Sequence, residues 1–62
     1  MCEANAYTLD GEKETLFMEA VDKVEPEGDG LRLTNIFGEQ KFIKAHVHML
    51  ALVDHKVLLR SN

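Results

Sequence analysis

Turn-forming residues divide this chain of 62 residues into short segments, and their spacing constrains the fold more than any other feature. Asp10 and Gly11 form a tight-turn pair between two strand-like runs, residues 26–30 contain one proline and two glycines, and Gly38 marks a third reversal. Turns at such spacing are typical of strands linked by hairpins. A chain this short has one small core, so we expect residues 1–62 to form a single domain.

The segments between the turns show the alternation of β-strands. Residues 2–9 place small side chains on one face, and the run at residues 14–20 is apolar on both faces in its middle. We expect residues 20–25 either to continue this strand with a bend or to form a separate strand, which ends at Pro26 because proline cannot donate to a strand ladder. Residues 31–36 alternate again, and residues 57–60 form a closing strand.

The segment 41–53 contains neither glycine nor proline, so a helix has to be weighed against a strand. Its alternate residues are all apolar, which matches a period of two and favours the strand. The segment is long for one strand, and we therefore expect a bend near residues 48–50. The apolar series comprises Ile43, Ala45, Val47, Met49, Ala51 and Val53.

These patterns predict an all-β fold, a small SH3-like β-barrel or curled sheet of about five short antiparallel strands. The chain has no tryptophan and few aromatic residues. In so short a chain we expect these rings in the core rather than on a surface that stacks bases. They are Tyr7, Phe17, Phe37 and Phe42.

Charge and composition argue against several partners and locations. The net charge is −4, from eleven acidic and seven basic residues, and the basic residues are dispersed rather than gathered in the stripe that nucleic acid favours. The longest mostly apolar run, residues 47–53, is much too short to span a bilayer. A single cysteine forms no intrachain disulfide and no leader pattern is evident, so we expect a cytoplasmic protein that does not bind membranes; the charge disfavours nucleic acid as a partner without excluding it.

Arrangements that support catalysis are missing, and we do not expect an enzyme. Ser61 is the only serine, and the glycines near residue 30 lack the lysine and serine of a phosphate loop. His46 and His48 would lie on one face of a strand, about 6–7 Å apart at the backbone. That pair is able to share a metal, or simply to lie on a solvated face. We expect His55 in an exposed turn.

Cys2, the only cysteine, follows Met1 and offers a different kind of metal site. A thiolate and a nitrogen two carbons apart close a five-membered chelate ring, and mixed nitrogen and sulfur donors in a plane suit Ni(II) or Cu(II). If Met1 is removed, the amine of Cys2 serves; if Met1 stays, its amine and the Cys2 amide do. The alternative is a small buried residue without a metal role, which is the commoner fate of a lone cysteine.

Several segments together resemble the CooT family of small nickel-binding proteins, the accessory proteins of carbon monoxide dehydrogenase. They are the Met1-Cys2 start, the Asp10-Gly11 turn, residues 21–25 and 28–31, the turn at 35–39 and the hairpin at 52–57. The resemblance implies a homodimer of SH3-like barrels that helps to supply nickel to that enzyme, with Cys2 as the ligand of Ni(II). We therefore expect a metallochaperone or nickel store for carbon monoxide dehydrogenase or a related nickel enzyme. His46 and His48 match no motif of the family.

The resemblance also implies how such a metal site is completed. Two copies of Cys2 that meet at a dimer axis, each with one sulfur and one nitrogen, supply four planar donors for one metal. The alternative hypothesis is a small RNA-binding or protein-interaction barrel with no metal role, a label that sequences of this kind have also carried.

Overall fold

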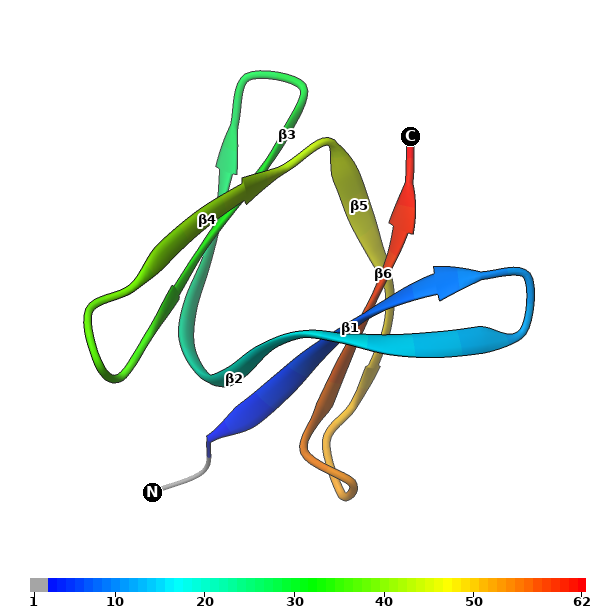
Figure 1. The fold of residues 1–62 in the computed structure, drawn as a ribbon, viewed down its shortest axis with the longest axis horizontal. Helices are drawn as coiled ribbons and strands as arrows, with labels where there is room; N and C mark the ends of the chain where they lie inside the picture. Colours follow the sequence, from blue (N-terminus) through cyan, green and yellow to red (C-terminus); the bar gives the residue numbers. More distant parts are fainter. Residues whose placement is uncertain (1–2) are drawn as a thin grey trace.

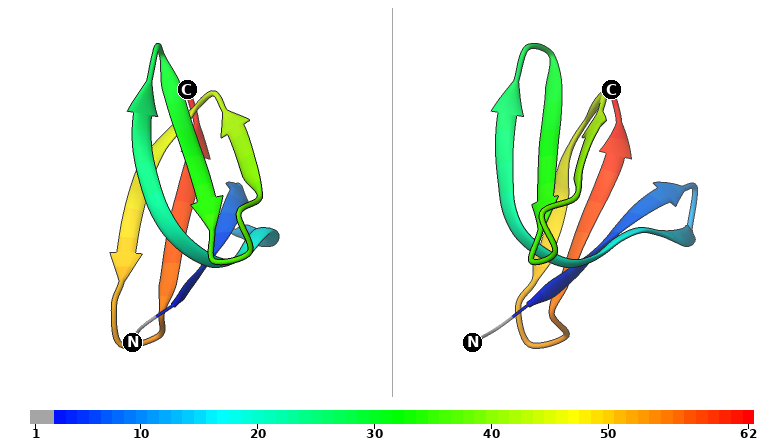
Figure 2. Two further views of the ribbon diagram at one scale, coloured as in Figure 1. Left: turned by 90° about the vertical axis from the view of Figure 1, so that its left-hand side faces the viewer. Right: turned by 60° about the vertical axis from the view of Figure 1, so that its left-hand side comes forward.

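The computed structural model describes residues 3–62, and all its regular structure is β-strand. One curled sheet has the strand order β4-β3-β2-β1-β6-β5 (Figures 1 and 2), which confirms the predicted all-β fold. The sheet has six strands where about five were expected. They are β1 (Ala4–Asp10), β2 (Lys13–Glu27), β3 (Gly30–Asn35), β4 (Gln40–Ile43), β5 (Ala45–Ala51) and β6 (Lys56–Ser61).

Strand β1 lies between β2 and β6, so the first and last strands of the chain are neighbours. It pairs with β2 in the antiparallel sense, as the Asp10-Gly11 turn predicted. It pairs with β6 in the parallel sense, with Ala6 opposite Val57 and Leu9 opposite Arg60. We expected only antiparallel pairs, because local turn signals report hairpins and cannot report a pairing between the two ends of a chain.

Strand β2 is long and bent, and it serves two neighbours in turn. Ala20 at the bend has a φ of 54°, its N–H donates to Asn5 Oδ1 at 3.0 Å, and its carbonyl accepts from Ile36 N at 3.0 Å. Before the bend β2 pairs mainly with β1, and from Val21 onward it pairs with β3. The curl of the sheet therefore depends on one left-handed residue that is held from both sides.

The expectation that the second strand ends at Pro26 was wrong, since β2 runs to Glu27. Pro26 lies opposite Leu31 of β3, and within residues 3–62 the pairing of β1 with β2 extends as far as Val21. Among the described residues the second half of β2 is thus paired on one side, where a residue without an N–H is tolerated.

The segment 41–53 is two strands rather than one. β4 ends at Ile43 and β5 begins at Ala45, so the chain turns at Lys44 from one edge of the sheet to the other (Figure 1). The expected bend near residues 48–50 is confirmed by an irregular register between Val47 and Met49. The corner passes so close to Gly30 that a Cβ there would lie 2.3 Å from the carbonyl oxygen of Ile43.

The core lies within the curl of the sheet and contains small and branched side chains. Ala6, Leu33 and Leu59 are completely buried at its centre. Two of the aromatic residues expected in the core are on the surface instead: Phe37 is 74% exposed and Phe42 is 48% exposed. Phe37 lies in the β3–β4 turn, where the chain has already left the curl, so its aromatic character did not predict burial.

Candidate functional site

Cys2, the predicted metal ligand, lies outside the described residues, and the described chain next to it is firmly anchored. The N–H of Asn5 donates to the carbonyl of His55 at 2.9 Å, which fixes the start of β1 against the start of β6. A mostly apolar pocket of about 320 Å³ is lined there by Ala4, Leu52 and His55 together with the first residues of β6. The start of β1 and the β5–β6 turn therefore lie at the same end of the molecule (Figure 2).

Large apolar side chains are exposed along β5 and in the turn that follows it. Their exposed fractions rise from 41% at Val47 to 92% at Val53. β5 is an edge strand that pairs only with β6 among the described strands. We call this the β5 surface: Val47, Met49, Leu50, Leu52 and Val53.

The histidines do not form a metal cluster in the part of the chain that the structure describes. Nδ1 of His46 lies 2.9 Å from Oδ1 of Asn62, so that ring is engaged by the chain's last residue. His48 sits where the β5–β6 register is irregular. No group of three His, Cys, Asp or Glu side chains within residues 3–62 is placed to hold an ion. His55 is exposed in a turn, as expected.

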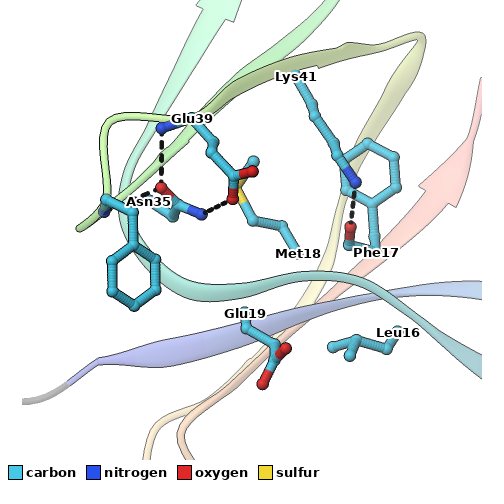
Figure 3. Close-up of a pocket in the computed structure, with 8 residues that line it drawn as sticks. Leu16, Phe17, Met18, Glu19, Asn35, Glu39 and Lys41 are labelled. Atoms are coloured by element: carbon cyan, nitrogen blue, oxygen red, sulfur yellow. Dashed lines mark hydrogen bonds between the residues drawn. The ribbon is translucent and has the colours of Figure 1, made fainter.

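A second pocket, which the sequence did not predict, lies between β2 and the β3–β4 turn (Figure 3). We call it the β2 groove; its volume is about 290 Å³. Met18 and Asn35 are its buried lining residues, and Leu16, Phe37, Glu39 and Lys41 are exposed around it. In the sequence, this groove was indicated only by Phe37, an aromatic residue beside Gly38 in a turn, because turn residues are rarely part of the core.

The β3–β4 turn that borders the β2 groove is held by Asn35, a polar residue that is only 4% exposed. Its Oδ1 accepts from the N–H groups of Phe37 at 3.0 Å and Glu39 at 2.9 Å, and its Nδ2 donates to Glu39 Oε1 at 2.6 Å (Figure 3). A buried amide with both ends satisfied stabilises one conformation of the turn. These hydrogen bonds therefore fix the backbone at Phe37 and Glu39 beside the groove before any ligand binds.

On the other side of the β2 groove, Lys41 reaches across to β2. Its Nζ donates to the carbonyl of Phe17 at 3.0 Å and lies 5.1 Å from the centroid of the Phe17 ring (Figure 3). The ammonium is thus placed by a backbone acceptor and by the face of an aromatic ring. This groove already accommodates one cation that belongs to the chain itself.

A second lysine is similarly placed, on the outer face of the β1–β2 hairpin. Lys56 Nζ donates to Glu14 Oε1 at 3.2 Å and lies 5.4 Å from the centroid of the Tyr7 ring. The hydrogen bond to Glu14 and the charge of that carboxylate raise the pKa of Lys56 above its ordinary value of 10.5. Two of the seven basic side chains are therefore already engaged with rings and acceptors of the chain.

Taken together, the fold and its surfaces define a class: a small all-β domain with one curled, barrel-like sheet and an exposed apolar edge. Within residues 3–62 no helix is long and apolar enough to cross a membrane. The family model "CO dehydrogenase accessory protein CooT" matches residues 1–60. The chain belongs to the CooT family.

A solved structure supports the same family at both the sequence and the fold level. It is a crystal structure from Carboxydothermus hydrogenoformans that carries the provisional name CooT. The two chains are 52% identical, each is covered over 98% of its length, and the TM-score is 0.93. No curated protein sequence matches this chain significantly.

Proposed function

We propose that this protein is a non-catalytic nickel-binding accessory protein that takes part in the maturation of carbon monoxide dehydrogenase or a related nickel enzyme. The observation that carries the proposal is the match to the accessory-protein family over residues 1–60, a range that includes Cys2. The thiolate of Cys2 and a nearby backbone or terminal nitrogen are the proposed ligands of Ni(II).

The surroundings of the chain start support a site shared between two copies. The start of β1 adjoins the β5–β6 turn through the pocket that Ala4 and Leu52 line, so the segment after Cys2 lies beside the apolar β5 surface. An exposed apolar row on an edge strand is a surface that proteins usually cover. A second copy seated there would bring two chain starts together and supply four planar donors.

Nickel binding is tested by titration calorimetry of the wild-type protein and of Cys2→Ser. We expect the variant to lose nickel binding, because a hydroxyl is a far poorer ligand than a thiolate for this ion. Binding by the wild type should weaken as the pH falls, since the thiol has to lose its proton to coordinate. The double variant His46→Ala/His48→Ala is the control and should bind nickel as the wild type does.

The shared site is tested by native mass spectrometry with and without added Ni(II). We expect one metal per two chains, and Val53→Asp should yield monomers because it places a charge in the proposed interface. Phe37→Asp, which alters an equally apolar exposed residue elsewhere, is the control. Unchanged nickel affinity in Cys2→Ser would contradict the assignment of the ligand, and a dimer that persists in Val53→Asp would contradict the interface.

A further inference from the structure

The first half of β2 has an unpaired edge next to the β2 groove. β1 pairs with this part of β2 on one side, from Lys13 to Met18. On the other side β3 begins to pair only at Val21, so residues 14–19 have no strand partner there within the described chain. Unpaired N–H and C=O groups along such an edge are able to bind a further extended segment.

The side chains around this edge provide two kinds of recognition. Phe37 is 74% exposed and Leu16 is 48% exposed, so apolar side chains of a bound segment that pack on them would remove them from water. Glu19 and Glu39 contribute two carboxylates, opposed by the single ammonium of Lys41. Glu39 uses Oε1 for Asn35, and a carboxylate has further acceptor positions available for a cation.

The contacts of Lys41 indicate which chemical group the free edge of β2 can bind. Its ammonium donates to the edge carbonyl of Phe17 and lies near the Phe17 ring, although the side chain is exposed and has other positions available to it. A cationic group from outside would find the same carbonyl, the same ring face and the nearby carboxylates. The guanidinium of arginine matches them best, because it stacks on rings and bonds carboxylates through two N–H groups.

We propose that the β2 groove binds an extended segment of a partner protein that carries an arginine or lysine next to an apolar residue. The segment pairs with the free edge of β2 at residues 14–19, its apolar side chains pack on Leu16 and Phe37, and its cation displaces Lys41 from the Phe17 carbonyl. The net charge of −4 favours the approach of such a basic segment. The β2 groove shares no lining residue with the pocket beside β1 or with the β5 surface.

The experiment uses the metal-free, full-length protein and a fluorescein-labelled peptide of about eight residues, long enough to follow the free edge. The peptide alternates valine and threonine around one central arginine. Two control peptides carry glutamate in place of the arginine, or proline beside it, which removes an edge hydrogen bond. We expect the arginine peptide to raise the fluorescence anisotropy on titration and both controls to bind much more weakly.

Variants of the protein locate the binding. Phe37→Ser should weaken the arginine peptide by about tenfold, since it removes a large apolar contact. Val53→Ser is its matched control on the β5 surface and should leave the affinity for the arginine peptide unchanged. Lys41→Met should strengthen binding by removing the competing cation, whereas Lys44→Met, which changes an exposed lysine paired with Asp29 across 3.9 Å, should not.

Amide chemical shifts provide a readout that does not depend on affinity. In a ¹⁵N spectrum the arginine peptide should shift the amides of residues 14–19 and of Phe37 most. The proposal is overturned if the glutamate peptide binds equally well, if Val53→Ser weakens binding as much as Phe37→Ser, or if the shifts lie on β5. It is also overturned if Phe37→Ser abolishes self-association, because the groove would then hold a second copy. These outcomes are independent of nickel binding.

Discussion

Strands β5 and β6 are paired neighbours with similar apolar content and opposite surroundings. Each has three large apolar side chains; those of β6 are at most 8% exposed, while those of β5 are at least 41% exposed. β6 lies between β1 and β5, whereas β5 pairs with β6 alone among the strands of residues 3–62. Position in the sheet therefore decides burial here, and the apolar row on β5 remains available to a partner.

The largest expected effect comes from changing a buried leucine of β6, with an exposed leucine of the β5 surface, in the turn after β5, as its counterpart. Leu59→Ala should lower the free energy of unfolding by about 2–5 kcal/mol, because it leaves a cavity in the centre of the core. Leu52→Ala, at a residue that is 77% exposed, should change it by less than about 0.5 kcal/mol. Urea denaturation followed by circular dichroism measures both. Similar losses in the two variants would show that the β5 surface stabilises the single chain.

A smaller effect is expected where the chain crosses from β4 to β5. A methyl group at Gly30 would meet the Ile43 carbonyl at 2.3 Å and Lys44 Cα at 3.0 Å, which are backbone atoms that cannot move aside cheaply. Gly30→Ala should therefore cost about 1–3 kcal/mol of unfolding free energy. The control is Gly28→Asn, because Gly28 has a φ of 59° and open space around it, and asparagine tolerates that conformation.

Gly30→Ala also bears on which contacts close the curl. Thermal denaturation of both glycine variants gives the comparison directly. If Gly30→Ala were as stable as Gly28→Asn, the close approach between β3 and the corner at Lys44 would not be needed for the fold.

The smallest effect is expected on the exposed face of the β1–β2 hairpin. Lys56 has a raised pKa because of Glu14, so this pair contributes stability that is present below the ordinary lysine pKa and is lost as the pH rises through the raised value. Glu14→Gln should lower the pKa of Lys56 toward 10.5 and remove that part of the pH dependence above this value.

The ¹³Cε chemical shift of Lys56, followed through an alkaline titration, measures this change. Glu12→Gln, in the adjacent turn, is the control because Lys56 pairs with Glu14. An unchanged titration midpoint in Glu14→Gln would show that the hydrogen bond between the two side chains does not persist in solution.

Most of the strands could be predicted from local signals, because turn residues and a period of two act within a few positions. The Asp10-Gly11 turn, the long bent second strand and the irregularity near residues 48–50 are all present. The break at Lys44 was missed, because no glycine or proline marks it and the apolar alternation of residues 41–53 continues through it. Val53, at the end of that alternation, is 92% exposed in the β5–β6 turn.

The candidate sites also differ in whether local sequence signals could predict them. Cys2 was found from its type and its place beside Met1, features that need no fold, and its role remains a prediction. The β2 groove combines residues from β2, from the end of β3, from the β3–β4 turn and from β4, and no local pattern links Phe17 with Lys41. The buried contacts of Asn35 could not be predicted either, because an asparagine near a glycine is typical of an ordinary turn.

The sequence by itself determined that this chain forms short strands joined by tight turns and places its one thiol next to the chain start. Only the tertiary structure decided which apolar residues are buried, because burial depends on the strands that lie on either side. The parallel contact of β1 with β6 and the turn at Lys44 leave Leu59 in the core and Val53 in water. Pairing between segments that are distant in the sequence determines which residues are buried, and no single stretch of the chain contains that information.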